Sequence, residues 1–280
     1  MDLPIVRSVA DLRAYVSQWR KDGLSVGLVP TMGALHDGHL TLVRTALETC
    51  DRVVVTLFVN PKQFGPNEDY GTYPRTEEED ATKLAGAGAH LLYAPDVAEM
   101  YGEDGGVTTV MVSGLGDVLE GEFRPGFFNG VATVVTKLLL QALPDRAFFG
   151  EKDYQQLNVI KRFVRDLDIP VDIQGVATVR EADGLAMSSR NAYLNFEERD
   201  IAPILYRTIS EVSERFKVGG KAEALSKWAA QQLLDAGFQK VDYVLICRED
   251  DLTQEAIKGQ PIRVLAAAFL GKARLIDNVG

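Results

Sequence analysis

The sequence predicts an α/β fold in which a mostly parallel sheet is followed by a smaller α+β domain. Apolar runs alternate with amphipathic helical stretches at intervals long enough for crossover connections, which is typical of parallel sheets. One run, residues 53–59, is almost continuously apolar and rich in valine, as expected for a strand that is covered on both faces. After about residue 195 the pattern changes to two helices and three short strands, which predicts the second domain.

The first elements frame a turn that carries two histidines. Residues 8–22 have a helical apolar stripe, with Ser8 as the expected N-cap and a glycine directly after the last residue. A buried strand is expected over 26–29. The stretch 30–39, Pro-Thr-Met-Gly-Ala-Leu-His-Asp-Gly-His, then leads into a helix that ends near residue 50. Because helix N-termini present unpaired N–H groups and a positive dipole end, we expect this turn to bind the phosphates of a nucleotide.

The strand over 53–59 ends at an Asn-Pro pair, and the next fifteen residues contain too many Gly and Pro residues to be regular. A loop as long as 61–75 is more often functional than idle in a compact protein. The remaining expected elements are, in order, a helix over 76–86 with Thr76 as its cap, a strand over 89–93, an irregular Gly-rich stretch over 97–129, a helix over 131–142 opened by Asn129 or Gly130, a strand over 146–149, a helix over 154–167, a strand over 171–179, helices over 196–215 and 221–236, and strands over 241–246, 262–269 and 274–277. We place the boundary near 178–185, which gives domains 1–180 and 181–280.

Composition restricts the class of protein. A formal charge of −10 argues against a general nucleic-acid surface but leaves room for a basic pocket that binds a small anion. No apolar run approaches the roughly 20 residues of a membrane span, and no secretory signal is visible. Cys50 and Cys247 lie in apolar stripes, so we interpret them as buried thiols, with a disulfide as the alternative. These features favour a cytoplasmic enzyme or binding protein.

Polar residues follow several of the expected strands at the point where each strand ends. The histidine turn follows the first strand, Asn60 and Gln63 follow the second, Lys152 and Asp153 follow the fourth, and 180–190 follows the fifth. Ligands of parallel sheets bind outside the carboxyl ends of the strands. We therefore expect these loops to converge on one site.

These residues together resemble the pantoate–β-alanine ligase (pantothenate synthetase) family, which has a His-x-Gly-His nucleotidyltransferase motif. The resemblance rests on Pro30-Thr-Met-Gly-Ala-Leu-His-Asp-Gly-His39, Phe58-Val-Asn-Pro-Lys-Gln-Phe64, Tyr73-Pro-Arg75, Phe149-Gly-Glu-Lys-Asp-Tyr-Gln-Gln156, Val179-Arg-Glu-Ala-Asp-Gly-Leu-Ala-Met-Ser-Ser-Arg-Asn191 and Leu275-Ile-Asp-Asn278. It implies a Rossmann-like domain with a smaller C-terminal lid domain, usually as a homodimer. It also implies an activity in which ATP and pantoate, with Mg²⁺, give pantoyl adenylate and pyrophosphate. β-Alanine then attacks the adenylate, giving pantothenate and AMP.

The resemblance also implies roles for individual residues. The catalytic group would be His36, His39 and Lys152, which offset phosphate charge. The nucleotide would further contact Met32, Gly33, Gly150, Asp153, Val179, Met187, Ser188, Ser189 and Arg190. Asp153 and Gly150 are expected at the ribose, Val179 and Met187 at adenine, and the Ser-Ser-Arg triplet at the phosphates.

The acid substrate and the metal have their own expected residues. Gln63 and Gln156 would bind pantoate through amides that orient a carboxylate without neutralising it, and Asn60 would help to shape this pocket with Tyr73 and Arg75. Asp80, with Glu79, is the expected Mg²⁺ ligand, because hard oxygen ligands suit this ion. One departure concerns Phe127 and Asn129, which stand where the family commonly has His and Arg, so local contacts there are in question.

Three simpler interpretations stay open at this point. The histidines could be turn residues satisfied by backbone groups, Asp153 could be a helix N-cap, and the acidic run that includes Asp80 could be a solvated face. The rival functions are a nucleotidyltransferase that does not ligate and a nucleotide-binding regulator without catalysis. The glutamines and the long 61–75 loop argue against the first rival, because they supply a pocket for an acid. The substitutions at 127 and 129 are the support for the second.

Overall fold

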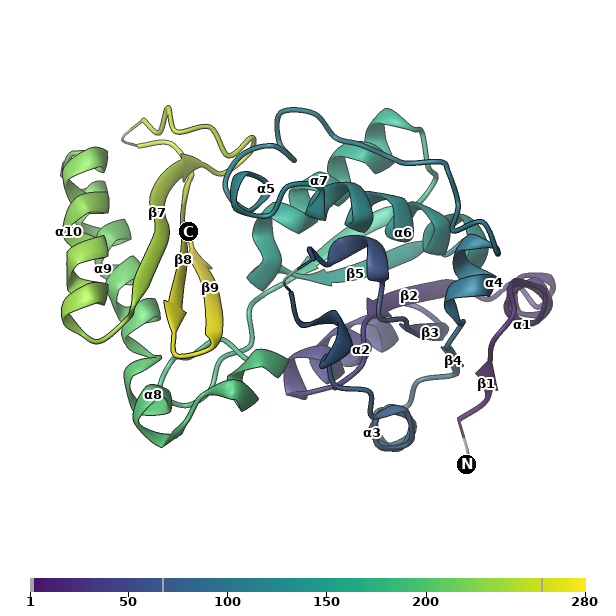
Figure 1. The fold of residues 1–280 in the computed structure, drawn as a ribbon. Helices are drawn as coiled ribbons and strands as arrows, with labels where there is room; N and C mark the ends of the chain where they lie inside the picture. The colour runs from purple at the N-terminus through teal and green to yellow at the C-terminus, as the bar shows by residue number, and fades with distance from the viewer. Residues whose placement is uncertain (1–2, 67, 258) are drawn as a thin grey trace. The chain divides into compact units, whose positions relative to one another are not determined.

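A computed structural model describes residues 3–66, 68–257 and 259–280. The chain forms two compact units (Figure 1). One unit comprises Met1–Glu151 and Val159–Ala177, and the other comprises Lys152–Asn158 and Thr178–Gly280. The short segment Lys152–Asn158 therefore belongs with the C-terminal part of the chain, although both of its neighbours in sequence belong to the first unit.

The first unit is built on a six-stranded sheet in the order β1-β4-β3-β2-β5-β6. Its strands are β1 (Ile5–Val6), β2 (Val26–Thr31), β3 (Arg52–Leu57), β4 (Leu91–Tyr93), β5 (Arg146–Gly150) and β6 (Asp172–Val176). All neighbouring pairs are parallel. The order reverses between β2 and β5, and such a switch point is where ligands bind in sheets of the Rossmann type. The predicted parallel α/β sheet is confirmed.

Helices cover both faces of this sheet (Figure 1). The helices of this unit that precede β5 are α1 (Val9–Lys21), α2 (Asp37–Thr49), α3 (Glu77–Ala87), α4 (Val97–Tyr101), α5 (Glu120–Phe123) and α6 (Phe127–Ala142), with the 3₁₀ helices η1 (Pro61–Gln63) and η2 (Asp69–Gly71). The side chain of Ser8 caps α1 as expected, accepting a hydrogen bond from Asp11 N at 3.1 Å. On the side of the sheet that α2 and α3 cover, apolar side chains form a hydrophobic cluster in which Val29, Val55 and Phe148 are at most 1% exposed.

Several boundaries in this unit differ from the predicted ones. The edge strand β1 was missed, because two residues give no periodic signal. Helix α6 starts at Phe127, ahead of the expected opening at Asn129 or Gly130, since Gly126 has the positive φ of 83° that starts it there. The stretches 61–75 and 97–129 were expected to be irregular, but they contain η1, η2, α4 and α5; Asn67 lies outside the described residues.

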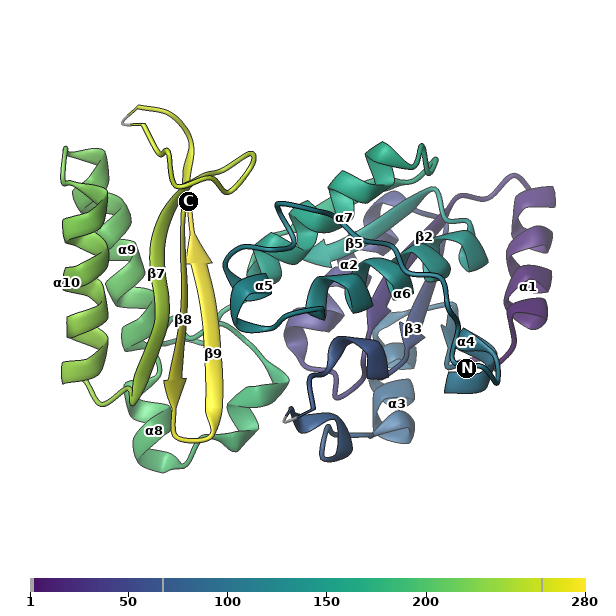
Figure 2. The same cartoon turned by 45° about the horizontal axis from the view of Figure 1, so that its top comes forward.

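The second unit contains a three-stranded antiparallel sheet in the order β7-β8-β9, with α9 and α10 packed beside it (Figure 2). Its elements are the start of α7 (Tyr154–Asp166), η4 (Ser189–Tyr193), α8 (Phe196–Ile201), α9 (Ile204–Lys217), α10 (Ala222–Asp235), β7 (Lys240–Arg248), β8 (Ile262–Leu270) and β9 (Ala273–Val279); the 3₁₀ helix η3 (Glu151–Asp153) precedes α7. The predicted helix over 196–215 is wrong in one respect. It is split before Ile204, because Pro203 has no N–H to continue the helical bonds. The small α+β domain is confirmed.

Two sequence expectations about chemistry are also answered. Cys50 and Cys247 are buried free thiols, so the disulfide alternative does not hold. Burial raises the pKa of the Cys247 thiol to about 12. Within the described part of the chain, the helices are all too short or too polar to cross a bilayer.

Candidate active site

The histidine turn connects β2 to α2 at the switch point of the sheet. His36 is the N-cap of α2, and its Nδ1 accepts a hydrogen bond from Gly38 N at 3.1 Å. The Nδ1 of His39 accepts from the backbone N–H of His36 at 3.4 Å, and the two rings lie 4.1 Å apart between centroids. Because each Nδ1 is an acceptor, the neutral form of each ring carries its proton on Nε2. The simpler interpretation, that backbone groups satisfy these histidines, thus applies to Nδ1 of each ring. The Nε2 of each ring is the nitrogen that donates.

A buried carboxylate binds the backbone of the histidine turn. Asp80 is 0% exposed, and its two oxygens accept hydrogen bonds from Ala34 N at 2.9 Å and Leu35 N at 2.8 Å. The hydroxyl of Thr76 donates to the same carboxylate at 3.1 Å and does not cap α3. These bonds stabilise a strained stretch, because Ala34 has a positive φ of 52°. Asp80 therefore fixes the backbone on which the histidines stand.

The expected magnesium ligands do not fit a shared metal site. Both oxygens of Asp80 are bound to backbone N–H groups, whereas Glu79 is exposed and pairs with Lys83 at 2.8 Å. Among the residues that the structure describes, there is no group of three or more His, Cys, Asp or Glu side chains that could hold a metal ion. Asp80 therefore serves to hold the turn, and Glu79 serves as a surface partner of Lys83.

Replacing Asp80 with asparagine should destabilise the protein by about 1–3 kcal/mol, because the new amide group turns an N–H₂ toward a backbone N–H. Thermal unfolding of Asp80→Asn and the parent protein, measured across a magnesium series, checks this expectation. The difference in midpoint should be the same at every magnesium concentration. A difference that grows with magnesium would restore Asp80 as a metal ligand. Glu79→Gln serves as the control, with an expected loss of at most about 0.5 kcal/mol from its surface pair with Lys83.

Asn60 organises the residues expected at the acid substrate. It is 1% exposed, and its Oδ1 accepts from Lys62 N at 3.2 Å and from the Tyr101 hydroxyl at 2.6 Å. Its Nδ2 donates to Gln63 Oε1 at 3.0 Å and to Gly130 O at 3.1 Å. An amide has two donors and two acceptor lone pairs, so the hydrogen-bonding capacity of Asn60 is fully used inside the protein. Asn60 thus holds Gln63 in place.

Gln63 joins this cluster to the histidine turn. Its Nε2 lies 3.0 Å from the sulfur of Met32, which belongs to the turn. Sequence reasoning missed two members of the cluster, Tyr101 and Gly130. Burial raises the pKa of Tyr101, so its hydroxyl stays a donor to Asn60. Neither carried a local signal, because their contacts bridge distant parts of the sequence.

The departure at Phe127 has a structural role. The guanidinium of Arg124 lies 3.7 Å from the centre of the Phe127 ring and pairs with Glu68 at 2.6 Å. Arg124 also donates to Gln63 O at 3.3 Å. Phe127 therefore packs the arginine that holds the backbone of Gln63, and nothing in the structure explains Asn129.

The second unit holds the remaining expected residues. In the 179–187 hairpin, Met187 N donates to Val179 O at 3.0 Å, so the two residues expected at adenine are adjacent. Ser188 then starts η4, and its hydroxyl accepts from Arg190 N at 3.3 Å. Lys152 lies in η3, where its ammonium group is 3.8 Å from Asp153.

The expected residues thus fall into two groups. The first unit carries Met32, Gly33, His36, His39, Asn60, Gln63, Glu79, Asp80 and Gly150. The second unit carries Lys152, Asp153, Gln156, Val179, Met187, Ser188, Ser189 and Arg190. In the first unit, the histidine turn, Asp80 and the Asn60 cluster are joined by direct contacts. In the second, the hairpin joins Val179 to Met187 and leads directly into the Ser-Ser-Arg triplet.

A Rossmann-type sheet with a His-x-Gly-His turn after its switch-point strand defines the class as an α/β enzyme of the nucleotidyltransferase type. The family described as pantoate-beta-alanine ligase matches residues 4–280. The pantothenate synthetase of Paramagnetospirillum magneticum is 62% identical over 276 residues, which is 99% of this chain and 97% of that protein. The chain belongs to the pantoate–β-alanine ligase family.

Solved structures agree. A crystal structure of pantothenate synthetase from Thermus thermophilus has a TM-score of 0.91 and 47% identity, covering 99% of both chains. The pantoate-beta-alanine ligase of Francisella tularensis, crystallised with beta-gamma ATP and beta-alanine, has a TM-score of 0.83 and 33% identity, covering 99% of this chain and 97% of that chain.

Proposed function

We propose that the chain condenses pantoate with β-alanine in an ATP-dependent reaction that passes through pantoyl adenylate and releases AMP and pyrophosphate. The observation that carries this proposal is the contact between Gln63 and Met32. It places an amide suited to an acid substrate against the turn whose histidines suit a triphosphate. A nucleotidyltransferase that does not ligate would have no need of this amide and its buried support.

The chemistry follows in two steps. A carboxylate oxygen of pantoate attacks the α-phosphorus of ATP, and the bond to the bridging oxygen breaks so that pyrophosphate leaves. The Nε2–H groups of His36 and His39 donate to the charge that builds on the phosphates, and Lys152 adds a cation. The amine of β-alanine then attacks the acyl carbon, loses a proton and expels AMP.

The second unit would supply further nucleotide contacts. The Val179–Met187 pair suits the edge and face of a base, Asp153 suits the ribose hydroxyls together with Gly150, and Ser188, Ser189 and Arg190 suit phosphate oxygens. Gln156 would bind pantoate with Gln63. The complex of the Francisella relative with beta-gamma ATP and beta-alanine supports ATP and β-alanine as ligands.

Mg²⁺ is expected to accompany ATP, because this ion binds phosphates with few protein ligands and keeps several waters. We assign it to no carboxylate of this chain. Assembly as a homodimer stays a prediction from the family resemblance, and a cytoplasmic location stays a prediction from the composition. Light scattering on a sizing column should then give twice the 30.7 kDa of one chain.

Exchange of labelled pyrophosphate into ATP tests the proposal. Exchange should require pantoate and should not require β-alanine, because the adenylate forms before the amine reacts. Exchange without pantoate, or none at all, would contradict the proposal. AMP release with all three substrates separates a ligase from a nucleotide-binding regulator.

A further inference from the structure

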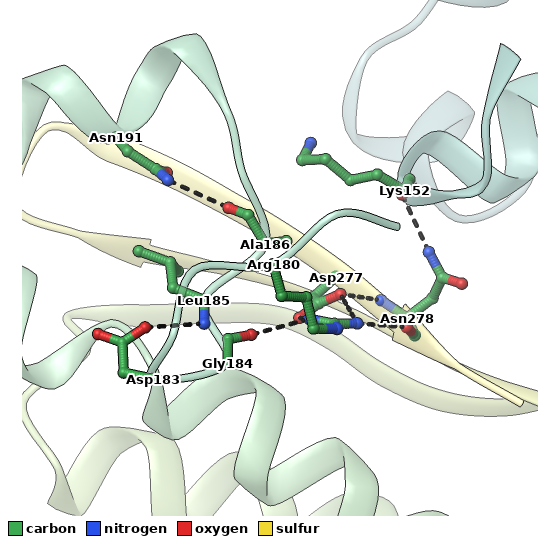
Figure 3. A network of polar contacts seen from close by, with 9 residues as sticks. All are labelled: Lys152, Arg180, Asp183, Gly184, Leu185, Ala186, Asn191, Asp277 and Asn278. Carbon is green, nitrogen blue, oxygen red and sulfur yellow. Dashed lines mark hydrogen bonds and ion pairs between the residues drawn. The ribbon is translucent and has the colours of Figure 1, made fainter. Parts of the chain in front are cut away.

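The closing segment of the chain, Leu275-Ile-Asp-Asn278, matches the family but has no role in the proposal above. It lies in β9 of the second unit, and Asp277 and Asn278 are each 4% exposed. Buried polar side chains of this kind are costly unless their bonds do something for the protein. Figure 3 shows what they bind.

Asp277 forms a bidentate ion pair with Arg180. The nitrogens Nη1 and Nη2 of Arg180 donate to the two carboxylate oxygens at 2.7 and 2.9 Å. The same nitrogens donate to Gly184 O at 3.0 Å and Asn278 O at 3.2 Å, and the guanidinium lies 3.8 Å from the centre of the Tyr206 ring. A planar guanidinium with this many partners is held in one position. Arg180 therefore locks the 179–187 hairpin onto β9.

Asn278 continues the chain of bonds to the Lys152 segment. Its Nδ2 donates to Lys152 O at 2.9 Å, and its backbone N–H donates to Asp277 Oδ1 at 2.7 Å. The side chain of Lys152 extends away from this network (Figure 3). Asn278 thus holds the backbone from which the ammonium group projects. The residue that begins α7, Tyr154, is also bound within the second unit, because its hydroxyl donates to Glu249 O at 3.3 Å.

We propose that Asp277 and Asn278 are positioning residues for ATP. They fix two segments relative to each other: the hairpin that carries Val179 and Met187, and the turn that carries Lys152. The inference rests on the proposed function, in which both segments contact the nucleotide. The distance between the segment that binds the base and the lysine that binds phosphate sets where the reacting α-phosphate lies. A small error in that position lowers the reaction rate.

Asn278→Ala is the main test, in pantoate-dependent pyrophosphate–ATP exchange. It removes the bond to Lys152 and keeps the Arg180–Asp277 pair. We expect kcat/KM for ATP to fall about tenfold while KM for pantoate stays unchanged, as for loss of one positioning hydrogen bond. Arg180→Lys keeps the charge and loses the fork, and it should move the ATP constants in the same direction.

The same unit offers two controls. Arg274 and Asp242 form a pair at 2.7 Å whose side chains are 17% and 2% exposed, against 18% and 3% for Arg180 and Asp277. Arg274→Met should therefore lower the unfolding midpoint and leave the ATP constants unchanged. Gln239→Ala removes a side-chain bond to Gly271 N at 2.8 Å and is the control for Asn278→Ala.

Two results would overturn the inference. One is unchanged ATP constants in Asn278→Ala; the other is a loss that affects pantoate equally and is reproduced by Arg274→Met, which would mean a merely structural role. Failure of the proposed function is a separate result, seen as absent pantoate-dependent exchange in the parent protein. In that case direct binding of a non-hydrolysable ATP analogue decides, and equal affinity of Asn278→Ala and the parent would reject positioning.

Discussion

Replacing His39 with alanine is expected to reduce pantoate-dependent pyrophosphate–ATP exchange by about two orders of magnitude or more, as does loss of a donor to a developing oxyanion. The reason is the tautomer set by the turn. Since Nδ1 of His39 accepts from the backbone N–H of His36, its proton is on Nε2, the nitrogen that would donate to phosphate oxygens in the proposed reaction. Initial rates of exchange with saturating pantoate measure this effect.

His39→Asn separates the two jobs of this side chain. Asparagine offers an oxygen near the position of Nδ1, so it can still accept from the His36 backbone, but it does not reach the position of Nε2. Exchange in His39→Asn should be as low as in His39→Ala, while its unfolding midpoint stays closer to that of the parent. Near-normal exchange in either variant would remove His39 from the reaction.

Gly130→Ala is expected to raise KM for pantoate at least about tenfold through strain of the order of 1–3 kcal/mol. A Cβ at Gly130 would lie 2.1 Å from Lys62 O and 2.7 Å from Gln63 N. Both atoms are backbone, so neither can rotate away. The η1 segment must shift, and the bond from Asn60 to Gly130 O must stretch or break. Gln63 then loses the support that orients it.

Gly86→Ala is the matched control for this substitution. Gly86 lies in helix α3, and a Cβ there meets no atom within 4 Å. Alanine should stabilise the helix by about 0.5–1 kcal/mol and leave the kinetics unchanged. Parallel steady-state kinetics and thermal unfolding of the two variants measure both effects. A normal KM for pantoate in Gly130→Ala would show that the loop accommodates the methyl group.

The central strands could be predicted because they are nearly continuous apolar runs and lie mostly buried in the sheet. The run over 53–59 and the apolar stretch over 26–29 became β3 and β2 with nearly the expected limits. The edge strand β1 and the limits of several strands could not be predicted this way. The expected strand over 171–179 stops at Val176, and Arg180 pairs with Ala186 in a separate hairpin.

The local conformation of the candidate site was predictable where the contacts join neighbours in sequence. The histidine turn is an example, since a strand, a turn and a helix cap are all contiguous in sequence. The role of Asp80 was not predictable, because its partners Ala34 and Leu35 lie far upstream. An acidic run gives the same pattern whether a carboxylate faces water, a metal or a buried N–H. Asn60 is a similar case, since its saturation depends on Tyr101 and Gly130.

The membership of Lys152–Asn158 in the second unit has a consequence for recombining relatives. A chimera with one crossover near residue 178 would combine Asn278 from one parent with the Lys152 turn from the other. The interface between Tyr154 and Glu249 would also be mixed. Exchange of the whole unit requires two inserts, 152–158 and 178–280, taken from the same parent. Gene shuffling should therefore tolerate breakpoints that transfer both stretches together better than a single cut.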